Sequence, residues 1–434
     1  MDDRSVREFD IVIFGASGFV GNYVIEEMAT SLEVAKIKWA IAGRNTRKLQ
    51  DALVRVEDHL RNEIDLKTIP IIEADVQNPS SIFEMCRRTK LLLNCVGPYN
   101  FYGGEQVVST CIECRTHCID LSAEVKYLDM VQAKYFELAR EKGVYVVQAC
   151  GVGSLPTDYG ITLLKNKFSG GLNSVEYYIQ FDDGPKGRTV GHGTFKSILH
   201  SSADYLNVSF EKEVEAKVFR KKLPKPNYPL KFGWMPIIYS MKEKAWCLKN
   251  FGPDLRNVKR SQMFRINFLD DGITIDTQSY LKVPSIPVLM QYIFAFIFFA
   301  ITSFWRTGRD LLEKNPSFFS AGLSSKAGPS REQVSQSITK VTFYADGWKD
   351  RSINSSNKQL RKPDRKIKLT IIGPEPAYAL TSLCMVQAGL TVLKEGDKMP
   401  LEGGVFTPGV AFEGTTIQER LEKRGMSFTF EDIL

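Results

Sequence analysis

A glycine-rich turn after the first apolar run constrains the fold of this chain more than any other feature. The run is Asp10-Ile11-Val12-Ile13-Phe14, and the turn is Gly15-Ala16-Ser17-Gly18-Phe19-Val20-Gly21. In a Rossmann βαβ unit such glycines let the backbone approach a pyrophosphate, while the helix N-terminus presents free N–H groups to it. A Rossmann fold without cofactor is the alternative, because glycine-rich turns also occur as plain connections. We predict that residues 15–21 bind a dinucleotide.

The first 150 residues continue with apolar runs that alternate with helical patterns. Predicted strands cover residues 10–14, 37–42, 68–72, 91–96, 117–120 and 144–148, and predicted helices cover 22–32, 47–60, 79–88, 105–114 and 125–141. Strands and helices that alternate at this spacing form a doubly wound parallel sheet. The sequence therefore predicts an α/β protein with an N-terminal Rossmann-type domain.

The pattern changes after residue 155. Runs rich in β-forming residues at 174–182, 263–269, 338–345 and 366–372 are not each followed by a helix, which indicates a second, mixed α+β domain. Residues 211–260 form an irregular, basic stretch, and a helical pattern returns at 378–393. We expect three parts: a dinucleotide-binding domain at 1–155, a mixed domain at 156–372 and a C-terminal segment at 373–434.

The ends of the later strands supply candidate cofactor contacts. Arg44 follows the second strand, where an NAD-binding enzyme usually carries an acid for the ribose 2′-hydroxyl. A guanidinium there can pair with a 2′-phosphate, which favours NADP(H) and leaves NAD(H) as the alternative; an arginine on a solvated turn would also explain it. Asp75 is expected on the adenine side, and Val96, Gly97 and Pro98 near the nicotinamide.

Composition and charge exclude several other classes of protein. The net charge of +7 is too mild and too dispersed to indicate nucleic acid binding. Residues 1–4 lead almost directly into the first strand, so we expect no secretory or transit segment, and eight cysteines that are reduced thiols. Residues 111–118 contain three cysteines and a histidine, but they end an amphipathic helix without a second such pair downstream, and we predict no metal.

Residues 283–305 form a run of 23 residues without a charge. As a helix, the last 20 of them would extend about 30 Å, enough to cross a bilayer. A buried core helix is one alternative. A spanning helix is another. It would place residues 366–372 and 378–393 on the opposite side of the membrane from the cofactor domain, although these segments look like parts that pack with that domain. We expect a monotopic anchor in a membrane or lipid monolayer, flanked by Lys282, Arg306 and Arg309.

Several segments together resemble the saccharopine dehydrogenase-like oxidoreductases. They are the glycine turn, Ala42–Arg44, Asn94–Tyr99, Asp120–Glu124, Gly193 and Thr194 with Ser197, and Gly403–Pro408. The resemblance implies an N-terminal Rossmann domain, a mixed α/β second domain and a segment at 373–434 that packs back toward the first. For animal members it also implies lipid droplets and membranes, so we expect the protein on lipid droplets and on the cytosolic face of membranes.

The sequence does not identify the reaction. The resembled family includes trans-acting enoyl reductases of lipid synthesis as well, so we expect a lipid-like substrate and no particular compound. A Tyr-x-x-x-Lys pair does not occur in the sequence, which sets aside the short-chain dehydrogenases. Tyr99, Asp120, Glu124 and His192 are polar candidates at strand ends or glycine-rich turns, but structural roles are favoured for each, and we assign no catalytic residue.

Three functional hypotheses follow. The first is a lipid-droplet or membrane-associated NADP(H)-dependent oxidoreductase with a small-molecule or lipid substrate. The second is a non-catalytic lipid-droplet scaffold that retains the fold and senses the cofactor. The third, a soluble enzyme of lysine metabolism, conflicts with the apolar run at 283–305. The sequence does not indicate the oligomeric state.

Overall fold

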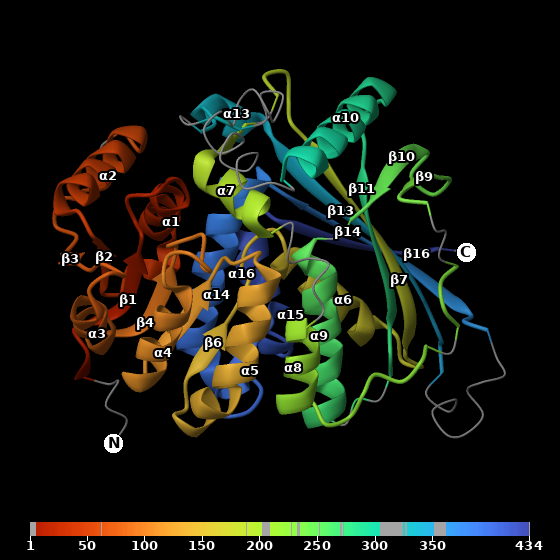
Figure 1. Ribbon diagram of the computed structural model, residues 1–434, viewed down its shortest axis with the longest axis horizontal. Helices are drawn as coiled ribbons and strands as arrows, with labels where there is room; N and C mark the ends of the chain where they lie inside the picture. The colour runs from red at the N-terminus through yellow and green to blue at the C-terminus, as the bar shows by residue number, and fades with distance from the viewer. Residues whose placement is uncertain are drawn as a thin grey trace. The chain divides into compact units, whose positions relative to one another are not determined.

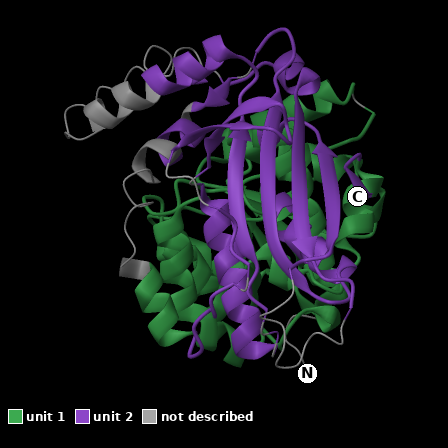
Figure 2. Ribbon diagram, turned by 90° about the vertical axis from the view of Figure 1, so that its right-hand side faces the viewer, with its two compact units in different colours: residues 1–155, 207–218, 377–424 green, residues 156–206, 219–376, 425–434 purple. Residues whose placement is uncertain are grey.

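The computed structural model describes residues 6–61, 63–187, 189–201, 209–226, 228–231, 235–250, 252–269, 271, 273–303, 324–325, 328–350 and 362–433. The chain divides into two compact units (Figure 2). Unit 1 comprises residues 1–155, 207–218 and 377–424, and unit 2 comprises residues 156–206, 219–376 and 425–434.

Unit 1 is built on a parallel sheet of seven strands (Figure 1). Along the chain they are β1 (Phe9–Phe14), β2 (Trp39–Gly43), β3 (Ile71–Glu73), β4 (Thr89–Asn94), β5 (His117–Asp120), β6 (Tyr145–Val147) and β15 (Gly404–Phe406). Their order in the sheet is β15-β6-β5-β4-β1-β2-β3. In register, Ile13 lies beside Ile41 on β2 and Leu93 on β4, and all three side chains are fully buried. The predicted Rossmann-type sheet is confirmed.

Two of the five described helices that connect the strands of unit 1 begin at an asparagine cap. The five are α1 (Phe19–Thr30), α2 (Thr46–His59), α3 (Pro79–Arg87), α4 (Gly104–Glu113) and α5 (Val125–Glu141). Asn45 and Asn78 cap α2 and α3 by accepting the backbone N–H groups of Lys48 and Ser81. The helix α8 (Ser209–Lys217) belongs to the same unit and packs on α5.

The C-terminal part of unit 1 completes the core of the Rossmann sheet. A π-helical turn at Pro376–Leu380 leads into α14 (Thr381–Glu395), which packs on α1, β4 and β5. The helical stretch Pro376–Lys398 is long and apolar enough to cross a membrane, but 83% of its most apolar window is buried inside the protein. It is therefore a core helix. The short helices α15 (Pro408–Ala411) and α16 (Ile417–Lys423) follow β15.

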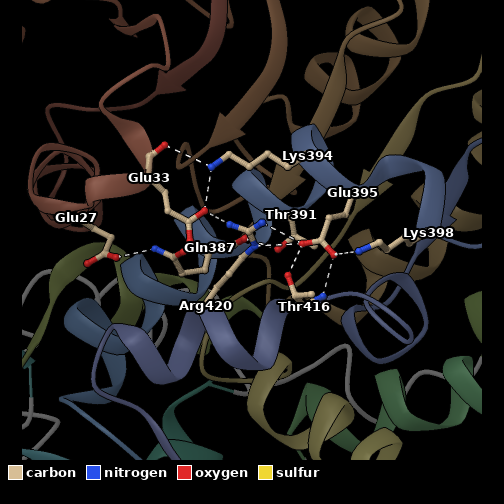
Figure 3. A network of polar contacts seen from close by, with 9 residues as sticks. All are labelled: Glu27, Glu33, Gln387, Thr391, Lys394, Glu395, Lys398, Thr416 and Arg420. Carbon is tan, nitrogen blue, oxygen red and sulfur yellow. Dashed lines mark hydrogen bonds and ion pairs between the residues drawn. The ribbon is translucent and has the colours of Figure 1, made fainter.

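A network of ion pairs and hydrogen bonds holds α14 and α16 to Glu27 on α1 and to Glu33 in the short 3-10 helix Leu32–Val34 that follows it (Figure 3). Arg420 on α16 pairs with Glu33 and also donates to Oε1 of Glu395, at 3.0 Å from Nη2. Lys394 pairs with Glu33 at 2.9 Å. Beside them, Gln387 on α14 donates to Glu27 at 2.9 Å. Because most of these groups are buried or half-buried, their charges are satisfied by each other rather than by water.

Unit 2 contains a broad mixed sheet of seven strands (Figure 2). They are β7 (Leu172–Asp182), β9 (Ile237–Ser240), β10 (Ala245–Lys249), β11 (Asp276–Lys282), β13 (Ile338–Gly347), β14 (Arg365–Gly373) and β16 (Ser427–Ile433), in the order β16-β14-β13-β7-β11-β10-β9. Only the pairing of β7 with β11 is parallel among these described strands. The predicted mixed second domain is confirmed.

Two helices, α6 (Leu155–Lys167) and α9 (Pro253–Phe268), cover one face of this sheet. A Cβ atom at Gly160 on α6 would lie 2.7 Å from the ring of Phe343 on β13, so only glycine permits this approach. On α9, the buried carboxylate of Asp254 accepts hydrogen bonds from Tyr177 on β7 and Ser279 on β11. Unit 2 also holds α7 (His192–Ser201), α13 (Arg331–Gln336), β8 (Val190–Gly191) and β12 (Ser324–Ser325).

The uncharged run at 283–305 forms the helix α10 (Ile286–Ser303) in the residues that the structure describes; residues 304 and 305 lie outside them. Pro287 lies in its first turn, where the absence of an N–H group costs no helical hydrogen bond. Leu289 is buried, whereas Ile286, Met290 and Phe294 are exposed. These three side chains recur every four residues and therefore form one exposed apolar stripe on the first half of the helix.

Several expectations about secondary structure were wrong. Residues 263–269 are not a strand but lie almost entirely in α9, whose buried face includes the polar side chains of Arg260, Gln262 and Arg265. Because these polar residues are buried and hydrogen-bonded, polar and apolar residues alternate along the helix as they would along a half-exposed strand. The stretch 211–260, expected to be irregular, contains most of α8, the β9–β10 hairpin and the start of α9. The third strand lies at 71–73, slightly later than 68–72.

The expected domain boundaries and the compact units differ at the C-terminus. Unit 1 ends its first segment at residue 155 and resumes at 377. The segment expected at 373–434 does not stay together, because β16 leaves unit 1 and pairs with β14, Leu369 lying opposite Phe430.

We predict that Glu395 makes the stability of the protein sensitive to acid. Burial alone raises the pKa of this carboxyl, but hydrogen bonds from Thr416, Arg420 and Lys398 outweigh burial and lower the pKa to about 2. Since the pKa is lower in the folded state, the stabilisation is present above about pH 4.5 and is lost as the pH falls toward 2. Glu395→Gln should remove up to about 3 kcal/mol of unfolding free energy at neutral pH.

Chemical denaturation between pH 7 and pH 3 measures this effect. The curve of unfolding free energy against pH should be flatter for Glu395→Gln than for the wild-type chain. Glu422→Gln, on the exposed side of α16, is the matched control and should leave the curve unchanged. Equal slopes for both variants would show that Glu395 does not carry the acid sensitivity.

Candidate functional site

The glycine turn lies directly after β1, and its conformation requires glycine at two of its positions. Gly15 has a φ of +85°, and a Cβ atom there would lie 2.8 Å from Cγ2 of Val96. A Cβ atom at Gly21 would lie 2.5 Å from the carbonyl oxygen of Gly15, because the first turn of α1 packs against the loop itself. The side chain of Asn22 braces the loop by donating to the carbonyl oxygens of Ala16 and Gly18. The backbone is thus held in a tight, fixed cradle.

Gly18 is the N-cap residue of α1 and is exposed. Its N–H donates to the carbonyl of Gly15 at 3.0 Å, which leaves the next N–H groups, of Phe19 and Val20, at the open end of the helix. Within the described stretch 6–61, no side chain caps this helix and no acidic residue lies in its first turn. The free N–H groups and the positive end of the helix dipole therefore suit a pyrophosphate.

The turn sits where the strand order of the sheet reverses. β1 pairs with β2 on one side and with β4 on the other, and ligands of open α/β sheets bind at such a switch point beyond the carboxyl ends of the strands. Val96 follows β4, and its N–H donates to Oδ1 of Asn94 at 3.1 Å. Gly97 is exposed and precedes Pro98 through a cis peptide bond. The structure thus brings Val96 to Gly15, as a shared site requires.

Arg44 lies directly after β2, at the same carboxyl edge of the sheet, and its side chain is exposed. Asn45 then caps α2, and Arg47 and Lys48 in the first turn of that helix are exposed as well. Three basic side chains within five residues give this corner of the sheet a positive charge, which suits a phosphate group beyond the pyrophosphate.

Asp75 follows β3 and is half-buried. Its Oδ1 accepts the N–H of Gln77 at 3.0 Å, and its backbone N–H donates to Oγ of Ser81 at 3.0 Å. These bonds shape the turn before α3, so part of the carboxylate serves local structure.

Two acidic side chains at the carboxyl edge, Glu124 and Asp120, hold loops of the scaffold in place. Glu124 is buried and accepts the N–H groups of Tyr99 and Asn100, at 2.8 and 2.9 Å. Asp120 accepts hydrogen bonds from Ser122, Ala149 and Tyr127.

Tyr99 donates to the carbonyl of Asn94 at 2.8 Å and accepts the N–H of Leu121 at 3.0 Å. Burial raises the pKa of Tyr99 well above its usual range, and raises that of the Cys95 thiol to about 12. Both groups therefore stay protonated at neutral pH. The side chain of His192 lies outside the described residues.

The C-terminal segment was expected to pack toward the Rossmann domain, but the sequence did not indicate which of its residues support the glycine turn. Tyr378 packs its buried ring against Phe19 of the turn and Tyr23 of α1, at centroid distances of 5.9 and 5.7 Å. Thr381 accepts the N–H of Val152 at 3.3 Å. More than 350 residues separate Phe19 from Tyr378 along the chain, and no local pattern in the sequence signals this contact.

The cysteine-rich segment at 111–118 is part of the core. Cys111 faces Cys86, with 3.6 Å between the sulfur atoms. His117 accepts the N–H of Tyr145 through Nδ1 at 3.0 Å. In the part of the chain that the structure describes, no three His, Cys, Asp or Glu side chains are grouped so as to hold a metal ion.

Comparison with known proteins identifies the family of this chain. Residues 11–147 match the model of the saccharopine dehydrogenase NADP binding domain. A saccharopine dehydrogenase-like oxidoreductase of Mus musculus is 36% identical over 427 residues, which cover 98% of this chain and 97% of the relative. A lipid droplet localized protein of Caenorhabditis elegans is 30% identical over 442 residues, which cover 98% of this chain and 99% of the relative.

A solved structure shares the whole fold. Saccharopine dehydrogenase (L-Glu forming) of Saccharomyces cerevisiae, without ligand, aligns over 98% of this chain and 100% of its own, with a TM-score of 0.55 and 13% sequence identity. This likeness concerns the fold alone. The identity and coverage of the curated relatives decide the family, and this chain belongs to the saccharopine dehydrogenase-like oxidoreductases.

Proposed function

We propose that this protein is an NADP(H)-dependent oxidoreductase that acts on an apolar, lipid-like substrate at a lipid surface. One observation carries the cofactor part of the proposal: the glycine cradle of residues 15–21 follows β1, and the exposed Arg44 follows the adjacent parallel strand β2, at the same edge of the sheet. When bound, the nicotinamide cofactor would accept or supply a hydride. The match of residues 11–147 to an NADP binding domain supports this proposal.

The residues divide the work of binding. The N–H groups after Gly18 hold the pyrophosphate, and Gly15 and Gly21 keep side chains out of its approach. Arg44 pairs with the 2′-phosphate, which distinguishes NADP(H) from NAD(H), and Arg47 and Lys48 add positive charge beside it. Val96 and Gly97 supply backbone next to the cradle, while Glu124 fixes the loop that follows them.

Exposed aromatic side chains at the same edge of unit 1 support an apolar substrate. Phe19 is 43% exposed in the turn after β1, and Phe101 and Tyr102 are 55% and 41% exposed in the loop after β4. Large apolar groups left exposed beside a binding cradle favour contact with an apolar ligand. A charged amino-acid substrate would call for polar groups there instead.

A lipid surface as partner is supported by α10. Its described part is an 18-residue helix without a charged side chain, and Ile286, Met290 and Phe294 are exposed along one stripe. An apolar stripe of this kind fits a helix that lies in the surface of a membrane or a lipid monolayer. The name of the Caenorhabditis elegans relative, lipid droplet localized protein, agrees with this surface.

A cofactor-sensing scaffold without catalysis is the second candidate. It is favoured by one observation: Tyr99, Asp120 and Glu124 are buried in hydrogen bonds that hold loops, so none of them serves as a proton donor in the described unit 1. Turnover decides between the two. If the protein is an enzyme, the purified protein should oxidise NADPH when an enoyl or carbonyl lipid is present. Tight binding of NADPH without turnover of any such lipid supports the scaffold.

We predict that Gly18→Asp abolishes dinucleotide binding without harming the fold. Gly18 has φ −75° and ψ 171°, which an aspartate at an N-cap adopts readily, and its Cβ atom would lie 3.3 Å from the carbonyl oxygen of Gly15. The loop has to shift only slightly, so thermal stability should change little. The carboxylate would lie where the pyrophosphate binds, and the dissociation constant for NADPH should rise at least about a hundredfold. Gly18→Asn is the control with the same size and cap but no charge. Titration by tryptophan fluorescence measures both; an unchanged affinity in Gly18→Asp would remove the site from residues 15–21.

Arg44→Asp should reverse the cofactor preference. Loss of a charge-assisted bond to the 2′-phosphate costs about 1.5–3 kcal/mol, so the ratio of NADPH to NADH affinity should fall at least about tenfold. Arg87→Asp, at the end of α3, makes the same charge change elsewhere in unit 1 and should leave the ratio as it is. An unaltered ratio in Arg44→Asp would show that this arginine is a surface residue only.

The triple variant Ile286→Ser, Met290→Ser and Phe294→Ser should detach the protein from lipid. Each exposed side chain that enters the hydrocarbon contributes about 1.5–3 kcal/mol, so partitioning onto triolein droplets coated with phosphatidylcholine should fall at least tenfold. Flotation of the droplets measures it. Leu138→Ser, at an exposed leucine of α5, is the control. Flotation of the triple variant equal to that of the wild type would contradict a role of α10.

A further inference from the structure

We infer that the hairpin of β9 and β10 is a second element that contacts the lipid surface, beside α10. This inference rests on the proposed attachment to lipid and adds residues that the uncharged run at 283–305 does not include. The hairpin comprises residues 237–249, in which Ser240 pairs with Ala245 and Tyr239 pairs with Trp246.

The two faces of the hairpin differ in burial. On one face, Ile238 and Cys247 pack against the stacked rings of Tyr178 and Tyr280, which lie on β7 and β11. Since strand residues alternate between faces, Tyr239 and Trp246 lie on the opposite face. They are 48% and 38% exposed, and their rings touch each other at a centroid distance of 5.5 Å.

The tip and the start of the hairpin add to this exposed surface. Met241 at the tip is 79% exposed, and Met235, just before β9, is exposed too. β9 is the last strand of the sheet, so its outer edge has no further described strand. Exposed apolar groups that gather within one short segment mark an interaction surface more strongly than scattered ones do.

The second strand of the hairpin, β10, lies beside the segment that leads from β11 into α10 (Figure 1). Cys247 pairs with Lys282 on β11, and the next residue, Val283, donates its N–H to the carbonyl of Trp246 at 2.9 Å. The helix starts at Ile286, three residues later. One backbone hydrogen bond thus connects Trp246 to the segment that leads into the apolar helix.

The chemistry of this surface fits a lipid with anionic headgroups. Tryptophan and tyrosine favour the boundary between headgroups and hydrocarbon, because one end of each ring system is apolar and the other polar. Lys244 at the tip is exposed, and Lys242 and Lys282 beside it pair with Glu176 and Glu243. At the tip these two pairs cancel and Lys244 contributes one positive charge, which attracts anionic headgroups to the aromatic face.

Vesicle binding tests the inference. Co-sedimentation with phosphatidylcholine vesicles, with and without phosphatidylserine, should show at least about tenfold weaker partitioning for the double variant Tyr239→Ser and Trp246→Ser than for the wild type. Phe83→Ser, at a phenylalanine of α3 that is 39% exposed, is the matched control and should bind as the wild type does. The thermal midpoint and the NADPH affinity of each variant show whether the fold is intact.

A second measurement does not depend on lost binding. Trp246→Phe keeps an aromatic face and should partition like the wild type, but quenching of tryptophan fluorescence by brominated phosphatidylcholine should be smaller in this variant. Equal quenching in both would place Trp246 away from the lipid and overturn the inference.

The remaining outcomes separate the two proposals. If the wild-type chain and the double variant bind vesicles equally well, the hairpin does not contact lipid, and attachment through α10 still stands. A wild-type chain that binds no vesicle or droplet overturns the lipid surface as a whole. A lipid-free dimer that the double variant converts to a monomer would assign this face to a second copy of the chain and overturn lipid contact.

Discussion

The close approach of a glycine turn to the neighbouring strand end is the contact on which the candidate site depends. Gly15 and Val96 meet where the strand order reverses, and neither Gly15 nor Gly21 has room for a Cβ atom. Because side chains are excluded, the backbone itself forms the cradle, and the first N–H groups of α1 stay open to an anion. Arg44, Asp75 and the loop after β4 follow strands that end at the same edge of the sheet as this cradle.

The cradle is supported by parts of the chain that are remote in sequence. Tyr378 packs beneath Phe19, α14 covers β4 and β5, and Arg420 with Glu395 holds α16 to α14. A helix that covers these buried strands has to be long and apolar. This explains why the composition of Pro376–Lys398 resembles that of a membrane-spanning helix although the segment lies in the core. The apolar helices α14 and α10 differ in burial: α14 is enclosed, and the first half of α10 exposes a stripe.

Apolar exposure recurs at two places with different consequences. At the cradle, the exposed side chains of Phe19 and Phe101 leave apolar surface beside the predicted cofactor site. In unit 2, the exposed stripe on α10 and the face of Tyr239 and Trp246 are connected where Val283 bonds to Trp246. An enzyme that takes its substrate from a lipid phase needs both an apolar entry and a means to stay at the surface. The family relation alone decides neither, since it fixes the fold and the class of cofactor domain.

By itself the sequence determined the Rossmann sheet, the glycine turn and the strand ends at Arg44 and Val96, because buried parallel strands and glycine turns leave strong local patterns. It failed at 263–269, where buried polar side chains of α9 bond to one another and to α6 and imitate a strand pattern. The tertiary structure alone decided that β15 extends the first sheet, that β16 joins the second, and that Tyr378 supports the turn. Such contacts join segments that are far apart in the sequence, and local periodicity carries no information about which distant surface a segment will cover.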